Sequence, residues 1–189
     1  MIRVNNISKS FNGNKVLKDI SFKFHKGKTN LIIGKSGSGK SVLTKCIVGL
    51  IEPDNGDVFY DERSFLNLKP KEKKVVRKEI GMLFQASALF DSLNVEENVA
   101  FPLRMFTNFS NEEILERVNF CLNRVNILNK NNLYPSELSG GMQKRVAIAR
   151  AISLQPKYLF CDEPNSGLDP VTAIVIDDFV IKQSRIETA

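Results

Sequence analysis

Short apolar runs separated by polar turns mark the amino-terminal part of this chain and predict strands there. The runs cover residues 2–5, 20–24 and 58–60, and the turn-forming sequence Asp54-Asn55-Gly56 precedes the last of them. We expect these three strands to pair as a small antiparallel sheet.

Three other apolar runs are short and uninterrupted, as in strands that are buried on both faces of a parallel sheet. They cover residues 31–33, 80–84 and 158–161. Helical segments accompany them: residues 42–48 predict a buried helix, most of 94–151 is helical, and Pro170 opens a final helix. The predicted architecture is therefore an α/β fold with a parallel core sheet, an antiparallel β subdomain and a helical subdomain over 94–151.

A glycine-rich loop joins the run 31–33 to the helix that begins at Val42. It reads Gly-Lys-Ser-Gly-Ser-Gly-Lys-Ser, a complete phosphate-binding pattern in the strand–loop–helix context that supports it. Glycine has no Cβ, so the backbone can turn its N–H groups inward around a phosphate, and the helix start adds its dipole. A plain surface turn is the alternative. The residues expected to bind ATP here are Gly34, Lys35, Ser36, Gly37, Ser38, Gly39, Lys40, Ser41 and Val42.

Within this loop, Lys40 and Ser41 carry the specific chemistry. The pattern predicts that the Lys40 ammonium reaches the β- and γ-phosphates and that the Ser41 hydroxyl binds Mg²⁺. A phosphate loop alone does not distinguish a kinase, a GTPase and a transporter motor, so the class depends on other segments.

The segment Leu138-Ser139-Gly140-Gly141-Met142 resembles the signature of ATP-binding cassette (ABC) ATPases, which in that family grips the nucleotide bound by a partner subunit. Gln85 resembles the Q-loop glutamine that senses Mg²⁺ and nucleotide, and Phe11 resembles the aromatic residue that stacks on adenine. Asp169 falls in a segment that resembles the D-loop, which crosses the dimer interface. These motifs occur in the family's order and cover essentially the whole chain.

Two acids follow the apolar run 158–161. Asp162 fits the carboxylate that holds Mg²⁺ through water, and Glu163 fits the base that polarises the attacking water. Taken alone, two acids after a strand would more often be solvated. Their position after the signature favours the catalytic interpretation, with Glu163 and Gln85 as catalytic residues and Ser41, Gln85 and Asp162 around Mg²⁺.

The resemblance implies a P-loop NTPase of ABC type, formed as one nucleotide-binding domain over 1–189, with its helical subdomain inserted in a RecA-like core. It implies ATP and Mg²⁺ as ligands and a homodimer that closes on ATP.

Two departures from the family pattern stand out. Met142 replaces the glutamine that many members carry, and Gln143 follows it. The family also has a switch histidine on a strand beyond Glu163, whereas the one histidine here, His25, precedes the phosphate loop. The sequence given ends at Ala189, before that strand. We therefore expect this chain to be a poor ATPase, with an open or distorted parallel sheet.

Composition supports a cytoplasmic protein. The formal charge is +6, part of it a basic run over 69–78 that glutamates interrupt, so a solvated helix face is expected and nucleic acid is not. Cys46, Cys121 and Cys161 are scattered among apolar residues and predict neither disulfides nor a zinc site. The amino terminus lacks the apolar stretch of a signal peptide, and no run approaches the ~20 residues that span a bilayer.

Most single-domain ABC ATPases drive transporters, and the apolar stretch 86–103 after Gln85 suggests the contact with a membrane permease. We expect the protein on the inner face of the cell membrane through that permease. The stretch 86–103, the signature and residues 167–173 most resemble ATPases of Mla/Mce-type phospholipid transport systems. Three alternatives remain: another importer or exporter, a non-transport ABC ATPase, or a chain that binds ATP without efficient hydrolysis.

Overall fold

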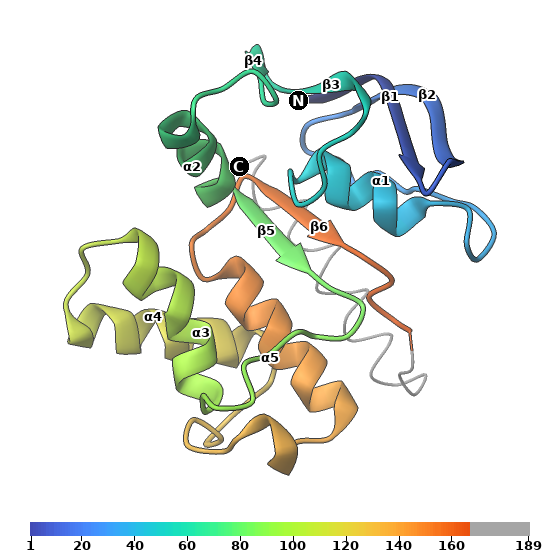
Figure 1. Ribbon diagram of the computed structural model, residues 1–189. Coiled ribbons are helices and arrows are strands. Elements are labelled where there is room, and N and C mark those ends of the chain that lie inside the picture. Colours follow the sequence, from blue (N-terminus) through green and yellow to red (C-terminus); the bar gives the residue numbers. More distant parts are fainter. Residues whose placement is uncertain (167–189) are drawn as a thin grey trace. The chain divides into compact units, whose positions relative to one another are not determined.

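The computed structural model describes residues 1–166 of the chain (Figure 1). The predicted final helix from Pro170 and the D-loop residue Asp169 lie outside the described residues. The chain divides into two compact units, Met1–Arg77 and the described residues from Lys78 onward.

The first unit contains an antiparallel sheet with strand order β2-β1-β3-β4 (Figure 1). The strands are β1 (Ile2–Phe11), β2 (Asn14–Phe24), β3 (Asn55–Tyr60) and β4 (Arg63–Ser64). The predicted antiparallel sheet is therefore confirmed, with longer strands than expected. Asn12 and Gly13 join β1 to β2 with φ of 49° and 82°, as a two-residue hairpin turn requires.

Two helices complete the first unit. In α1 (Lys40–Ile47), the side chains of Leu43, Thr44, Cys46 and Ile47 are buried. The Tyr60 hydroxyl on β3 donates to the Ile47 carbonyl at 3.0 Å, which ties the helix to the sheet. The basic run forms α2 (Pro70–Lys78), where Val76 is buried while Lys71 and Lys74 are exposed. This is the solvated helix face expected from the sequence.

The second unit contains a parallel strand pair, β5 (Ile80–Leu83) and β6 (Tyr158–Cys161). Their register runs from Ile80 opposite Tyr158 to Leu83 opposite Cys161. Both strands were predicted to belong to the parallel core, and both do.

The third predicted parallel strand, residues 31–33, is wrong for the described structure. The segment forms no strand, and Leu31 and Ile33 are 77% and 86% exposed. A strand satisfies its backbone N–H and C=O groups only through a neighbouring strand. An apolar run indicates the tendency to be buried, but it cannot supply that neighbour.

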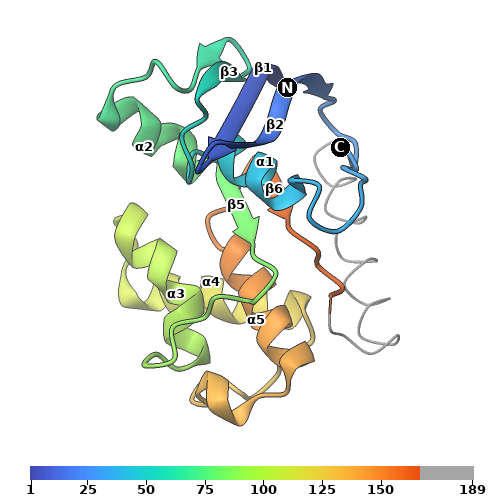
Figure 2. The ribbon, with the colours of Figure 1, turned by 45° about the vertical axis from the view of Figure 1, so that its right-hand side comes forward.

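Helices form most of residues 94–151, as predicted (Figure 2). They are α3 (Val95–Phe106), α4 (Asn111–Arg124), the 3₁₀ turn η1 (Pro135–Glu137) and α5 (Gly140–Ile152). Capping boxes at Asn94 and Ser110 precede α3 and α4. The side chains of these two residues therefore fix where the two helices begin. The apolar faces of α3, α4 and α5 share one core. Within residues 1–166, none of the helices has the length and apolar character needed to cross a bilayer.

Candidate nucleotide-binding and catalytic sites

The glycine-rich loop lies in the first unit and has a conformation that needs glycine. Gly37 and Gly39 have φ of 74° and 95°, where side chains cause strain. A Cβ on Gly34 would lie 2.6 Å from the Ser38 Oγ, which is closer than van der Waals contact allows. Residues 34–38 are exposed. The loop is therefore both tightly turned and accessible to a ligand.

Lys40 and the start of α1 follow this loop directly. The Lys40 Nζ donates to the carbonyls of Gly34 at 3.0 Å and Lys35 at 3.2 Å, so the ammonium folds back over the loop. No side chain in the described chain caps α1 at Gly39. The backbone N–H groups of a first helical turn have no partner within the helix, and here they coincide with the phosphate-binding pattern at Ser41 and Val42. This chemistry fits a bound polyphosphate.

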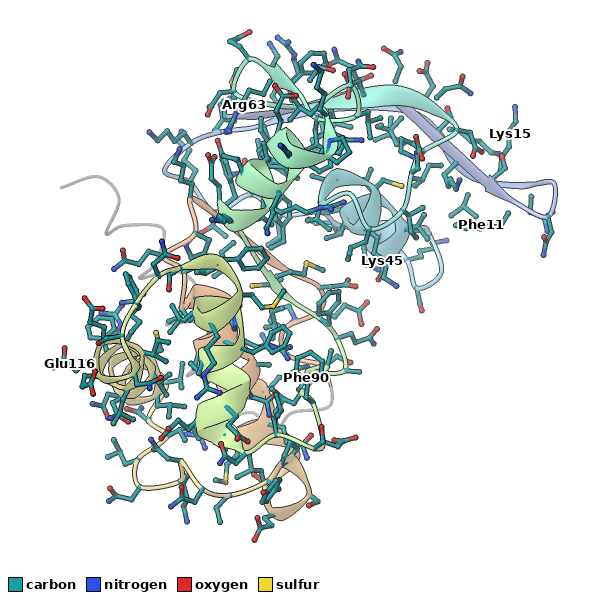
Figure 3. All side chains as sticks on the ribbon, turned by 60° about the vertical axis from the view of Figure 1, so that its left-hand side comes forward. Phe11, Lys15, Lys45, Arg63, Phe90 and Glu116 are labelled. Carbon is teal, nitrogen blue, oxygen red and sulfur yellow. The ribbon has the colours of Figure 1, made fainter. Side chains whose placement is uncertain are left out.

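Phe11 lies at the end of β1 with 42% of its surface exposed, and it is labelled in Figure 3. A Cβ on Gly39 would lie 3.1 Å from the side chains of both Val16 and Leu17 on β2. The β1–β2 hairpin therefore packs against the glycine-rich loop and carries an accessible aromatic ring. The sequence analysis missed Val16, the first apolar residue after the hairpin turn.

Gln85, Asp162 and Glu163 follow the paired strands of the second unit. The Asp162 backbone N–H donates to the Leu83 carbonyl at 2.9 Å, which extends the β5–β6 pairing by one step. The Gln85 Nε2 donates to a carboxylate oxygen of Glu163 at 3.1 Å. Asp162 is buried and Glu163 is exposed. Because parallel strands end at the same edge, Gln85 lies beside Glu163, although the two are 78 positions apart in sequence.

The arrangement of the acids suits magnesium bound with phosphate. Within residues 1–166, no cluster of three or more His, Cys, Asp or Glu side chains forms a metal cage. Mg²⁺ usually takes only one or two carboxylates and completes its coordination with phosphate and water. Asp162 offers such a carboxylate, so the residues present fit the ion.

The signature segment begins α5 and does not precede it as a loop. Ser139 is the N-cap, and its Oγ accepts from the Met142 N–H at 3.3 Å. Gly140, Gly141 and Met142 therefore form the first turn of this helix. Ser139 and Gly140 are exposed, whereas the neighbouring Leu138 is buried in the core.

Met142 and Gln143 explain how the chain tolerates its departure from the family pattern. Met142 is partly buried against the core of the second unit. The Gln143 Nε2 donates to the carbonyls of Pro135 at 2.9 Å and Leu138 at 3.4 Å. An apolar residue thus faces the core while the adjacent glutamine ties the segment before the signature to the helix.

Two cations on α5 bind loops near Gln85 and Glu163, and the sequence analysis missed both. The Arg150 guanidinium donates to the carbonyls of Ser87 at 3.0 Å and Ala88 at 2.8 Å. Burial lowers the pKa of Arg150. Ser87 and Ala88 both have positive φ, so Arg150 holds an unusual backbone just after Gln85. The other cation is Lys144. Arg150 lies among apolar residues, which was an available signal, whereas Lys144 lies between Gln143 and Arg145 and gave none.

The predicted permease-contact stretch 86–103 carries an exposed aromatic pair. Phe90, which is labelled in Figure 3, and Phe101 are 43% and 39% exposed. Their ring centroids are 4.7 Å apart. Behind them the buried Asn98 binds the N–H and C=O of Phe90 and the carbonyl of Leu93. Two adjacent rings are therefore presented to solvent, Phe90 from the loop and Phe101 from α3.

Comparison with known proteins identifies the family. The family described as "ABC transporter" matches residues 17–166. The probable ribonucleotide transport ATP-binding protein mkl of Mycobacterium tuberculosis is 38% identical over 180 residues, 95% of this chain and 50% of the relative. The methionine import ATP-binding protein MetN of Clostridium acetobutylicum is 44% identical over 172 residues, 91% of this chain and 53% of the relative. The chain thus spans about half the length of the curated relatives it matches.

A solved structure agrees. The dimeric ATP-binding cassette MJ0796, in a post-hydrolysis state with ADP and Pi, has a TM-score of 0.92 at 32% identity, over 99% of this chain and 84% of that chain. The predicted fold class, a P-loop NTPase of ABC type, is confirmed. The particular closeness to phospholipid-transport ATPases is not confirmed, because these relatives are named for other cargo. This chain belongs to the ABC transporter family and has the fold of an ABC ATPase domain.

Proposed function

We propose that this protein binds ATP with Mg²⁺ and hydrolyses it as the motor subunit of an ABC transporter. In this proposal Lys40 and the loop amides bind the phosphates, and Ser41 and Asp162 hold Mg²⁺, which neutralises phosphate charge. Glu163 polarises the attacking water, oriented by Gln85. The observation that carries the proposal is the 3.1 Å hydrogen bond between Gln85 and Glu163 at the edge of the parallel strands. It joins two of the predicted catalytic residues.

The proposed active form is a homodimer in which the signature of one subunit contacts the ATP of its partner. Ser139 and Gly140 are exposed at the start of α5, where helix dipole and free amides favour an anion. The dimeric state of the similar cassette supports this arrangement. Asp169 would cross the interface, and Phe11 would stack on adenine.

The proposed membrane partner is a permease that covers Phe90 and Phe101. Exposed aromatic pairs are typical of protein interfaces, where rigid rings bury much area. Docking there would hold the subunit on the inner face of the membrane. Nucleic acid is not part of the proposal.

Phospholipid is the cargo suggested by the sequences of residues 86–103, 138–142 and 167–173. The relatives are named for ribonucleotide transport and methionine import, so these are the competing cargoes. Reconstitution of the ATPase with its permease distinguishes them, because cargo should raise ATP turnover. Stimulation by methionine or a ribonucleotide but not by phospholipid would contradict the lipid hypothesis.

The test of the nucleotide site uses a fluorescent ATP analogue with Mg²⁺, together with phosphate release. Lys40→Ala should weaken binding about 10–100-fold, because a charged hydrogen-bond donor to phosphate is lost. Lys45→Ala is the matched control, since Lys45 lies on the same helix and is labelled in Figure 3. It should bind normally. Unchanged binding by a folded Lys40→Ala protein would refute the site.

The dimer is tested by mixing a Lys40→Ala protein with a Ser139→Arg protein. One intact composite site should form in the mixed dimer and restore part of the activity that each variant lacks alone. Absence of ATP-dependent association in every mixture would refute the composite site.

A further inference from the structure

Lys144 is a buried lysine on the helix that begins with the signature. Its exposure is 3%, and it lies within α5. A buried ammonium is unfavourable unless strong acceptors replace its water. The burial of its charge therefore needs an explanation in its contacts.

The acceptors of Lys144 are backbone carbonyls at the two ends of one turn. Its Nζ donates to the Ser166 carbonyl at 2.8 Å and to the Glu163 carbonyl at 3.3 Å. The turn itself is closed by the Ser166 N–H, which donates to the Glu163 carbonyl at 3.1 Å. The ammonium thus binds the turn that begins at the proposed catalytic carboxylate.

Glu163 has a backbone conformation that must be held in place. Its φ is +49°, in the left-handed region that residues other than glycine seldom adopt. Its carboxylate accepts from Gln85 at 3.1 Å, while its carbonyl accepts from Lys144. Burial lowers the pKa of Lys144, and the nearby negative charge of Glu163 opposes that shift.

We propose that Lys144 is a positioning residue for ATP hydrolysis, which fixes the backbone of Glu163 so that its carboxylate stays beside Gln85. The inference rests on the proposed function. Lys144 touches carbonyls of the chain and acts through Glu163, so its loss should affect turnover and not ATP binding. Because the signature begins the same helix, one rigid element carries both the proposed partner contact and the anchor of the carboxylate.

The chain offers a matched control in the adjacent residue. Arg145 also lies on α5, and its Nη1 donates to the carbonyls of Asn126 at 3.0 Å and Val125 at 3.4 Å, just after α4. It is therefore another cation that binds two backbone carbonyls, but at a place that does not include Glu163. Replacing Arg145 should lower the stability of the fold without changing the position of the Glu163 carboxylate.

The experiment measures kcat and KM for ATP, binding of a fluorescent ATP analogue and the melting temperature. Lys144→Met should lower kcat about 10-fold or more and leave KM within about 2-fold, since a transition-state interaction is lost. Arg145→Met should lower the melting temperature while kcat changes by less than about 2-fold. Equal losses of kcat in both variants would overturn this inference but leave the proposed function standing. A wild-type protein that binds ATP but releases no phosphate would overturn the proposed function and this inference with it.

A double-mutant cycle separates positioning from general damage. Gln85→Ala and Lys144→Met both act on Glu163, so their combined loss of kcat should be smaller than the product of the single losses. Gln85→Ala combined with Arg145→Met should lower kcat by the product of the two single losses. Multiplicative losses in both pairs would overturn the inference. If Lys144→Met does not fold, Lys144→Gln, which keeps a neutral donor, takes its place in the same cycle.

Discussion

Two lysines in this molecule make the same kind of contact in very different surroundings. In the first unit, Lys40 donates to the carbonyls of Gly34 and Lys35 on an exposed loop. In the second unit, Lys144 donates to the carbonyls of Glu163 and Ser166 and is 3% exposed. Each ammonium holds a loop through two carbonyls, yet only one of them is removed from water.

The difference in burial separates a binding group from a structural one. An exposed ammonium can exchange carbonyls for phosphate oxygens at little cost, because water is available throughout. If a buried ammonium leaves its carbonyls, the ammonium and the carbonyls both stay buried without a hydrogen-bond partner. The comparison predicts that replacing Lys40 affects ligand binding. Replacing a buried cation such as Lys144 should instead affect the stability and the geometry of the second unit.

The largest expected effect comes from Glu163→Gln. This variant tests whether Glu163 of the second unit is needed for ATP hydrolysis and not for ATP binding. The amide keeps the size of the side chain but cannot act as a base. Phosphate release should fall about 10²–10⁴-fold while the fluorescent ATP analogue binds as before. Asp91→Asn, an exposed acid elsewhere in this unit, is the control. Normal turnover by Glu163→Gln would assign the base to another residue.

Next in size is Arg150→Met, which tests the structural role of a buried cation. The carbonyls of Ser87 and Ala88 lose their donors, so the free energy of unfolding should fall by about 2–4 kcal/mol. Denaturant unfolding measures this change. Lys40→Ala should change the same free energy by less than about 0.5 kcal/mol, as expected for an exposed group. Similar losses in the two variants would contradict the comparison.

A smaller effect is expected at the start of the signature helix. Ser139→Ala removes the oxygen that accepts from the Met142 N–H and should lower the free energy of unfolding by about 1 kcal/mol. Ser139→Thr keeps that oxygen and should retain most of it. Ser136→Ala, at an exposed position just before, is the control in denaturant unfolding. A loss at Ser136 as large as that at Ser139 would refute the capping role.

A pH-dependent effect concerns the thiols of the second unit. Burial raises the pKa of Cys121 to about 11 and of Cys161 to about 12. A thiol with a raised pKa favours the folded state while it is neutral. That contribution is complete below the unfolded pKa of about 8.5 and is lost as pH rises from there toward the folded pKa. Chemical unfolding at pH 8 and pH 10 measures the loss. Cys121→Ala should reduce this pH dependence, and an unchanged profile would contradict the burial argument.

The sequence by itself determined those features of the protein that depend on residues close together in the chain. Spacing alone predicted the glycine-rich loop, because its function depends on consecutive backbone atoms that include Gly37 and Gly39. Hydrophobic periodicity predicted the antiparallel sheet and the helices over 94–151, since amphipathic patterns depend on near neighbours. The signature at residues 138–142 was identified by its resemblance to the ABC family, and not by periodicity.

Only the tertiary structure decided what depends on distant partners. The apolar run 31–33 looked like a buried strand, yet it forms none, because a strand is completed by a neighbour that no local pattern specifies. The meeting of Gln85 with Glu163 followed from the parallel pairing of β5 with β6. The role of Lys144 was hidden for the same physical reason: a charge on a helix has meaning only when the fold shows which carbonyls it binds.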